Sequence, residues 1–224
     1  MKVGGCMNSI LEVKHLSFSV GEKEILKDIS FKIQKGDFLT IKGPSGSGKS
    51  TLLKLLAAIM NPSAGEIIYK GKPLSEYEIT DYRKEVSYSF QNAALFGTTV
   101  ADNLMFPYEI RNEPFDRDRA IALLDKVMLS KQYLDQKITE LSGGEKQRVA
   151  LIRNVLFTPE VLLLDEVTSA LDAENRKVIS EAILRLNREN KITVLWVTHN
   201  TDEINDAAKT IEMKAGRLEV VSHD

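Results

Sequence analysis

The fold is decided by the stretch Gly43-Pro44-Ser45-Gly46-Ser47-Gly48-Lys49-Ser50-Thr51, which fits the pattern G-x-x-x-x-G-K-[ST] of phosphate-binding loops. Residues 38–41 before it form a short apolar run that is typical of a buried strand, and residues 52–59 after it are typical of a helix. Strand, loop and helix, in that order, are the setting in which such a loop binds phosphate groups. We therefore expect a nucleotide site on an α/β framework.

The loop offers several kinds of phosphate contact. Its glycines let backbone N–H groups turn inward, and the helix that follows directs free N–H groups to the same point. Lys49 supplies a mobile ammonium for the β- and γ-phosphates, Ser50 is the expected Mg²⁺ ligand, and Thr51 is expected to donate toward the α-phosphate. The alternative is a glycine-rich turn capped by serine with a solvated Lys49, and the flanking elements argue against it. The predicted nucleotide contacts are Gly43, Pro44, Ser45, Gly46, Ser47, Gly48, Lys49, Ser50 and Thr51.

The composition is that of an ordinary globular chain of 224 residues that can bury one sizeable core. A net charge of −2 gives no basic field for a polyanion, so no nucleic acid is expected as a partner. No stretch approaches the roughly 20 apolar residues of a membrane span, so any membrane role requires another polypeptide. The single cysteine, Cys6, excludes an internal disulfide framework and fits a reducing cytosol. Residues 1–7 and 222–224 are expected to be flexible tails.

The N-terminal third combines antiparallel strands with the central α/β unit. Residues 10–20 and 28–33 alternate between apolar and polar side chains and predict strands, and residues 66–69 predict an edge strand. The helix after the phosphate loop is expected to end near Asn61-Pro62.

Helical patterning dominates residues 92–158, and Pro159 stops the last helix of this region. Apolar side chains recur there at helical spacing: Ala120, Ile121, Leu123, Leu124, Val127, Met128, Val149, Ile152, Val155 and Leu156. We interpret this region as a helical subdomain inserted into the α/β core.

The remaining core consists of predicted strands at residues 85–91, 161–164 and 193–198 and a hairpin at 210–221. A helix between the last two strands has the buried stripe Val178, Ile179, Ala182, Ile183 and Leu186. In an open parallel sheet, ligands bind outside the carboxyl ends of the strands. The residues at these ends are Gln91, Asp165, Glu166 and His199.

These end residues differ in chemistry. Asp165 follows four apolar residues and fits a carboxylate that holds Mg²⁺ directly or through water. Glu166 is then free to take or orient the proton of an attacking water, although two adjacent acids also suit a solvated helix N-cap. His199 is expected to donate to the γ-phosphate, although a lone histidine at a strand end is more often structural. Gln91 suits a neutral ligand that comes and goes around Mg²⁺ and water. The predicted metal ligands are Ser50, Gln91 and Asp165.

The stretch LSGGEKQR at residues 141–148 predicts a second anion-binding site. Ser142, Gly143 and Gly144 open a helix that is expected to run through Phe157, and free N–H groups at its start suit a phosphate. A capping box between Ser142 and Glu145 is compatible with this interpretation.

Together these motifs resemble the ATP-binding cassette (ABC) ATPases. LSGGEKQR matches the signature motif of that family, and the phosphate loop, Gln91, residues 161–166, residues 169–172 (SALD) and His199 follow in the family's order and spacing. The resemblance covers about residues 8–221 and implies the α/β fold of a P-loop NTPase. Residues 8–91 and 159–221 would form a RecA-like core with an antiparallel β subdomain, and residues 92–158 the inserted α-helical subdomain.

The resemblance further implies that two chains pair head to tail as a homodimer, with ATP between them. One copy would contribute Lys49 and the other its signature residues Ser142, Gly143 and Gly144. The implied catalytic residues are Lys49, Gln91, Glu166 as base and His199 as γ-phosphate sensor, and Asp172 would help to couple the two sites.

One position departs from the family pattern. The family usually places an aromatic ring under adenine near the end of the first strand, where this chain has Val20. Strand alternation puts Phe18 on the same face, so either residue is a candidate to cover the base. We therefore expect weak discrimination between ATP and GTP.

The resemblance also implies a role in transport. Such chains are most often the energy-coupling subunits of transporters, held at the cytoplasmic face of the membrane by a permease whose helix enters a groove between Gln91 and the signature. Phe96, Phe106 and Tyr108 suit either an exposed docking patch or the subdomain's own core. The sequences of residues 95–112, 162–172 and 194–205 resemble those of the bacterial Fet-type ATP-binding proteins, which are thought to serve iron export. The alternative is a soluble cassette ATPase that moves no cargo, such as an iron–sulfur assembly or mechanochemical ATPase.

Overall fold

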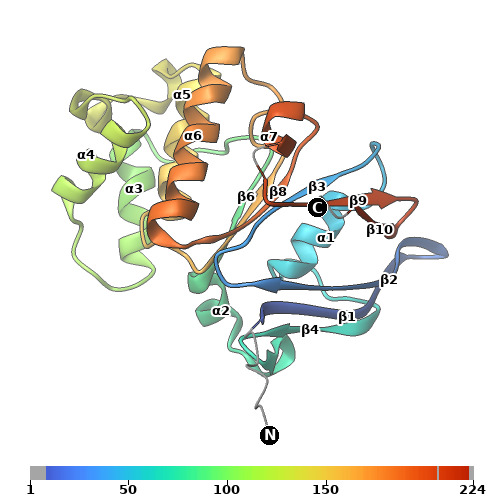
Figure 1. Cartoon of the computed structure of the whole chain (residues 1–224). Coiled ribbons are helices and arrows are strands. Elements are labelled where there is room, and N and C mark those ends of the chain that lie inside the picture. Colours follow the sequence, from blue (N-terminus) through green and yellow to red (C-terminus); the bar gives the residue numbers. More distant parts are fainter. Residues whose placement is uncertain (1–8, 206, 222–224) are drawn as a thin grey trace, which may run out of the picture.

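Alternating and continuously apolar strands form two separate sheets in the computed structural model, which describes residues 9–205 and 207–221 (Figure 1). The predicted tails, residues 1–7 and 222–224, lie outside the described residues. One sheet is antiparallel, in the order β2-β1-β4-β5. Its strands are β1 (Ser9–Val20), β2 (Lys23–Gln34), β4 (Ala64–Tyr69) and β5 (Lys72–Pro73). The prediction of strands at 10–20, 28–33 and 66–69 is confirmed. The prediction that 66–69 is an edge strand is wrong, because β5 pairs with its last two residues.

The other sheet has six strands in the order β10-β9-β3-β8-β7-β6. Its strands are β3 (Phe38–Lys42), β6 (Val86–Ser89), β7 (Val161–Asp165), β8 (Thr193–Val197), β9 (Lys209–Lys214) and β10 (Arg217–Val221). Neighbours from β9 to β6 run parallel, and only β10 is antiparallel. The parallel strands therefore deliver their carboxyl ends to one edge.

Helices pack on and between these sheets (Figure 1). They are α1 (Lys49–Leu56), α2 (Ile79–Glu85), α3 (Val100–Glu109), α4 (Arg117–Lys126), α5 (Gly143–Val155), α6 (Ala173–Asn190) and α7 (Thr201–Asn205), with 3₁₀ turns η1 (Leu74–Glu76), η2 (Lys131–Asp135) and η3 (Ile138–Glu140). Within the described ranges, none of these helices is long and apolar enough to cross a membrane.

The parallel strands are apolar throughout because each of their faces lies in a different core. On β7 and β8, Leu163 and Leu195 face a core shared with α1 and the antiparallel sheet. Leu162, Leu164 and Trp196 face a second core formed with α3, α4, α5 and α6. Figure 1 shows this arrangement, with α1 between the two sheets and the other four helices beyond the parallel sheet. A strand that is buried on both faces cannot alternate, which explains the run VLLLD.

Helix α1 ends at Leu56, so the prediction that it extends to Asn61-Pro62 is wrong. Ala58 has φ +54°, a left-handed conformation that ends the helix. The carbonyls at this end accept hydrogen bonds from side chains of α2: the Tyr82 hydroxyl donates to Leu56 O (2.5 Å) and Arg83 Nη2 donates to Ala58 O (2.6 Å). The helix end is thus fixed by tertiary contacts.

The predicted helical stripe from Ala120 to Met128 is only partly correct. Ala120, Leu124 and Val127 are buried, but α4 ends at Lys126 and Met128 is 73% exposed. Met128 has φ +59°, so its side chain leaves the direction that a continued helix would give it. Two smaller corrections concern α5, which ends at Val155 and not at Phe157, and Glu85, which ends α2 and is not part of a strand.

An ion-pair cluster joins β4, α2 and the start of β7, and it predicts a loss of stability in acid. Glu160 pairs with Lys35 (2.8 Å) and Lys70 (3.3 Å), and Lys70 also pairs with Glu85 (2.7 Å). The hydrogen bond from Lys35 is the main reason why the pKa of Glu160 lies below its ordinary value of 4.5. A carboxylate with a lowered folded-state pKa stabilises the fold above its ordinary pKa, and this contribution disappears as the pH falls through the folded-state value.

We therefore expect Glu160→Gln to reduce the free energy of unfolding by about 1 kcal/mol at pH 7, because the cations of the cluster are half-exposed. At a second, acidic pH the difference between the variant and the parent should shrink, since the wild-type carboxylate becomes protonated as the pH falls through its lowered pKa. Urea unfolding of both proteins at the two pH values measures this difference. A difference that is the same at both pH values would contradict an electrostatic origin.

Candidate functional site

The phosphate loop connects β3 to α1, and its glycines are required by the local geometry. Gly43 has φ +146° and Gly48 has φ +102°, values that L-residues rarely adopt. A Cβ atom on Gly43 would lie 2.1 Å from the carbonyl oxygen of Met213 in β9, and one on Gly48 would lie 2.7 Å from the Leu26 side chain. The C-terminal hairpin and β2 therefore hold the loop from outside, and its open side carries the exposed residues Pro44, Ser45 and Gly46.

Lys49 lies inside the loop with only 4% of its surface exposed. Its Nζ donates to the carbonyl oxygens of Gly43 (2.8 Å) and Pro44 (3.1 Å), and no ion pair within the described residues engages it. Burial lowers the pKa of Lys49, while the negative charges of Glu166 and Asp165 oppose this shift. A buried ammonium whose contacts are backbone carbonyls can exchange them for phosphate oxygens, which are stronger acceptors.

Asp165 ends β7 and is 5% exposed, with both of its oxygens occupied. Ser50 Oγ donates to Oδ1 (2.8 Å), and the Tyr88 hydroxyl donates to Oδ2 (2.7 Å). The structure thus brings together Ser50 and Asp165, two of the three predicted metal ligands, and hard oxygen donors of this kind suit Mg²⁺. Burial, followed by the bond to Asp165, raises the pKa of Tyr88, which keeps its hydroxyl protonated as a donor.

Glu166 lies one residue further, where the backbone turns sharply. Its φ of +50° is unusual for a residue other than glycine, and such conformations cluster at functional sites. Its Oε1 lies 3.2 Å from His199 Nε2, and its Oε2 accepts from Gln91 Nε2 (3.3 Å). Gln91 also donates to the hydroxyl of Ser169 (3.4 Å). Three of the four predicted end residues, Gln91, Glu166 and His199, therefore meet at the Glu166 carboxylate.

A hollow of about 230 Å³ opens beside Glu166. Its lining includes His199 and polar side chains from the turn after β7, the start of α7 and α6. The space is large enough for water molecules and faces both the carboxylate and the imidazole. This arrangement can bring a water molecule to a base, which is the first requirement of hydrolysis.

The predicted second anion site is built as a helix N-terminus. Ser142 is the N-cap of α5 and forms a capping box with Glu145: Ser142 N donates to Glu145 Oε2 (2.8 Å) and Glu145 N donates to Ser142 Oγ (3.3 Å). Ser142 and Gly143 are exposed, whereas Gly144 is buried. A Cβ atom on Gly144 would lie 2.4 Å from Cγ of Asn175, whose Nδ2 donates to Asp172 (2.8 Å). The start of α5 is therefore packed against the start of α6, where Asp172 is the N-cap.

The two anion sites do not meet within one copy. No hydrogen bond of the described residues joins Ser142, Gly143 or Gly144 to the phosphate loop. In Figure 1, α5 and α1 lie in different parts of the molecule, with α6 between them in this view. The two predicted anion sites are thus separate surfaces of the described chain.

Comparison with known proteins identifies the family of the chain. The model of the ABC transporter family matches residues 26–169, from β2 through both anion sites to the turn after Glu166. The chain belongs to this family. As an ABC cassette it is an ATPase, and its α/β architecture is the P-loop NTPase fold of that family.

Individual relatives align with nearly the whole chain. This chain is 45% identical to the probable iron export ATP-binding protein FetA of Escherichia coli (strain K12), over 96% of both chains. It is 36% identical to the energy-coupling factor transporter ATP-binding protein EcfA1 of Enterococcus faecalis, over 95% of this chain and 78% of the relative. Among solved structures, the cassette MJ0796 in a dimeric post-hydrolysis state with ADP and Pi is 28% identical, with a TM-score of 0.85 over 96% of this chain and 100% of that one.

The two candidates for covering the base, Val20 and Phe18, differ in their exposure to solvent. Val20 is 61% exposed at the end of β1, whereas Phe18 is partly buried and packs against the core beside α1. The pairing of β1 with β2 shifts in register between Phe18 and Ser19, so simple alternation fails here. Of the two candidates for covering the base, Val20 is the more exposed.

The aromatic residues before the signature divide between two roles. Tyr108 is 3% exposed and belongs to the helical core, whereas Phe96 and Phe106 are 41% and 40% exposed and stack edge to face with centroids 5.0 Å apart. They line a groove of about 320 Å³ between α2, α3 and α5 together with Phe90 and Ile110. We call this the aromatic groove. Its lining also includes four cations and no carboxylate among the described residues, namely Arg83, Lys84, Arg111 and Arg153.

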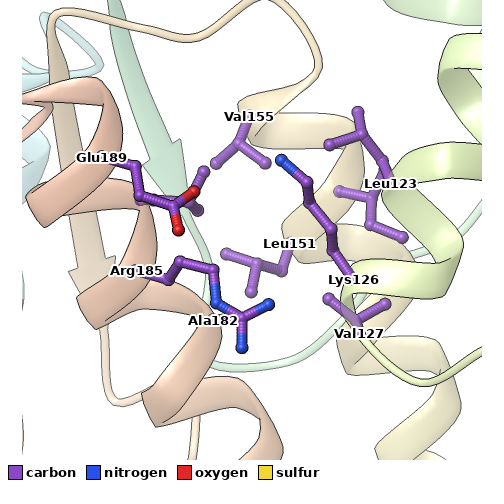
Figure 2. A pocket seen from close by; sticks show the side chains of 10 residues that line it. Leu123, Lys126, Val127, Leu151, Val155, Ala182, Arg185 and Glu189 are labelled. Atoms are coloured by element: carbon purple, nitrogen blue, oxygen red, sulfur yellow. The ribbon is translucent and has the colours of Figure 1, made fainter.

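A second hollow, between α4, α5 and α6, carries none of the predicted site residues. Figure 2 shows leucine and valine side chains on its walls and Lys126, Arg185 and Glu189 at its edge. Its volume is only about 20 Å³, which is far too small for a nucleotide. We assign it to the packing of the helical region.

Sequence reasoning missed two site contacts. Tyr88 was predicted only as part of a strand, and Asn175 was not singled out. Tyr88 shares a strand with the residues leading to Gln91, so its position near the strand end was a usable signal. Asn175 follows the N-cap Asp172 at the third helical position, where its side chain had no local reason to reach Gly144.

Proposed function

We propose that this cassette is the ATP-hydrolysing subunit of a transporter that exports iron or another metal or small solute. The main support for ATP hydrolysis at this site is that Lys49, Asp165, Glu166 and His199 converge on one edge of the parallel sheet. The proposal of iron export rests on the relative from Escherichia coli that is named for it. The chain would lie at the cytoplasmic face of the membrane, held there by a permease.

In this proposal, ATP is the substrate and lies along the phosphate loop, with Lys49 on the β- and γ-phosphates. Ser50, Asp165 and Gln91 would hold Mg²⁺, which when bound supplies positive charge that offsets the charge on the phosphate oxygens. Among the described residues there is no group of three or more His, Cys, Asp or Glu side chains that could hold a metal ion by itself.

Glu166 would take the proton of the attacking water. Its two oxygens lie near different partners, Oε1 at His199 and Oε2 at Gln91, so its orientation is set from both sides. His199 Nε2 would then donate to the γ-phosphate after releasing Glu166, and the buried Lys49 would stabilise the oxygen of the leaving ADP.

The signature surface would act on the ATP of a second copy. Because Ser142 and the phosphate loop do not meet in one chain, a head-to-tail homodimer is the arrangement that lets both grip one triphosphate. ATP binding would then close the dimer, and hydrolysis would remove the contacts that hold it. The dimeric form of the similar cassette MJ0796 supports this arrangement.

The aromatic groove is the proposed docking site of the permease. Lys84 pairs with Asp81 (2.8 Å), whereas no ion pair of the described residues engages Arg83, Arg111 or Arg153. Exposed rings beside these arginines fit a short cytoplasmic helix that presents apolar side chains and carboxylates. Arg153, for example, donates to the carbonyl of Ala94 (3.0 Å) and lies over the ring of Phe96 (5.3 Å), and burial lowers its pKa. A carboxylate from a partner would neutralise the buried positive charge of Arg153.

Site-directed crosslinking tests the docking site. In a Cys6→Ser background, a photocrosslinker on Phe106→Cys should capture a polytopic membrane protein from native membranes, because Phe106 lines the groove. The matched control is Met128→Cys, since Met128 is also an exposed hydrophobic residue but lies outside the groove. Capture of a soluble protein alone, or equal capture from both positions, would count against the transporter and favour a non-transport ATPase.

A further inference from the structure

Tyr88 contributes a hydrogen bond to the metal site that no motif of the chain predicts. It lies on β6, and its hydroxyl donates to Oδ2 of Asp165 (2.7 Å) while Ser50 Oγ donates to Oδ1 (2.8 Å). The carboxylate is therefore held at both oxygens by side chains from two different elements. Removing either donor would free it to rotate about its terminal bond.

The ring of Tyr88 is itself held in place. The ring of Phe90, two residues on, packs edge to face against it, with centroids 4.7 Å apart and planes at 85°. Phe90 is 53% exposed and lines the aromatic groove, whereas Tyr88 is half-buried behind it. The phenol is thus held by its ring contact with Phe90 and by the hydrogen bond from its hydroxyl to Asp165.

We propose that Tyr88 is a positioning residue of the magnesium site, which fixes the Asp165 carboxylate so that Oδ1 remains beside Ser50. This inference rests on the proposed role of Asp165 as a metal ligand. With Oδ2 tied to the phenol, Oδ1 is the oxygen that faces Ser50 and any ion bound there. Partners of this kind orient metal-binding groups, and their loss typically costs about 10- to 100-fold in metal affinity.

The test compares nucleotide binding with and without metal in Tyr88→Phe. In the purified full-length chain, calorimetry gives the Kd of ADP in excess Mg²⁺ and in excess EDTA. The Kd in EDTA divided by the Kd in Mg²⁺ reports how strongly metal and nucleotide favour each other's binding. We expect the ratio to fall about 10-fold in Tyr88→Phe, with the Kd of metal-free ADP unchanged, because the phosphate loop is intact. A ratio equal to that of the wild type would overturn the proposal.

The control variant is Tyr77→Phe. The Tyr77 hydroxyl is also part-buried and donates to a protein oxygen, the carbonyl of Tyr69 (2.9 Å), but it lies outside the nucleotide site. Its ratio should match the wild type. An equal fall in Tyr77→Phe and Tyr88→Phe would indicate a general loss of stability and would overturn the specific role.

Two further variants distinguish a wrong metal assignment for Asp165 from a wrong role for Tyr88. Asp165→Asn should lower the ratio at least as much as Tyr88→Phe. If Asp165→Asn has no effect, the metal assignment itself fails, whereas an effect of Asp165→Asn without one of Tyr88→Phe refutes only the role of Tyr88. If Tyr88→Phe does not fold, Phe90→Ala keeps the hydroxyl but loosens the ring, and it should also lower the ratio. An unchanged ratio in that variant would then overturn the proposal.

Discussion

Replacement of Glu166 by Gln is expected to leave ATP binding intact and to lower the rate of ATP hydrolysis roughly 100-fold or more, the usual contribution of a general base. Glutamine has nearly the same shape and retains an oxygen toward Gln91 or His199, but it cannot accept a proton at neutral pH. The proposed phosphate and Mg²⁺ contacts of Lys49, Ser50 and Asp165 are unchanged in this variant, since none of these residues bonds to the Glu166 side chain among the described contacts. Steady-state phosphate release and equilibrium ATP binding measure the two properties separately.

A suitable control for this variant is Glu181→Gln, which changes an exposed carboxylate of α6 outside the hollow beside Glu166. Its turnover should equal that of the wild type. Near-normal turnover of Glu166→Gln would refute the base assignment. Loss of ATP binding together with turnover would instead show that Glu166 supports the site structurally through its contacts with His199 and Gln91.

The parts of the site that the sequence predicts are those whose position follows from strand direction. Asp165, Glu166 and His199 follow strands that are apolar throughout, and parallel strands bring their carboxyl ends to one edge. The apolar pattern of β7 and β8 was strong because each strand is buried on both faces. The placement of these side chains at one edge of the sheet was therefore accessible from the sequence.

The contacts that depend on register were not accessible. Tyr88 reaches Asp165 because β6 pairs with β7 so that Tyr88 lies opposite Leu163, two residues before Asp165. No local pattern gives this alignment. The same holds for the end of α1, which depends on hydrogen bonds from Tyr82 and Arg83. It holds also for the left-handed backbone of Glu166, whose N–H donates to the carbonyl of Val197 in β8 (3.0 Å).

The separation of the two anion sites leads to the last expected result. Ser142→Arg should abolish ATP-driven dimer formation while ATP binding to the single chain remains. Ser142 is exposed at the start of α5, where the helix N-terminus presents free N–H groups. A long cationic side chain there would fill the surface that is proposed to receive the γ-phosphate of the second copy. Light scattering of the variant in a Glu166→Gln background, with and without Mg²⁺ and ATP, measures dimer formation.

Two matched variants separate this effect from loss of the helix cap, which is worth about 1 kcal/mol. Ser142→Thr keeps a capping hydroxyl and should still dimerise, and Ser130→Arg places the same charge on another exposed serine that precedes a short helix without capping it. If Ser142→Arg dimerises with ATP as readily as Ser130→Arg, the start of α5 does not grip the nucleotide of the partner. In that case the second anion site belongs to the capping of α5 alone, and closure of the dimer must depend on other contacts.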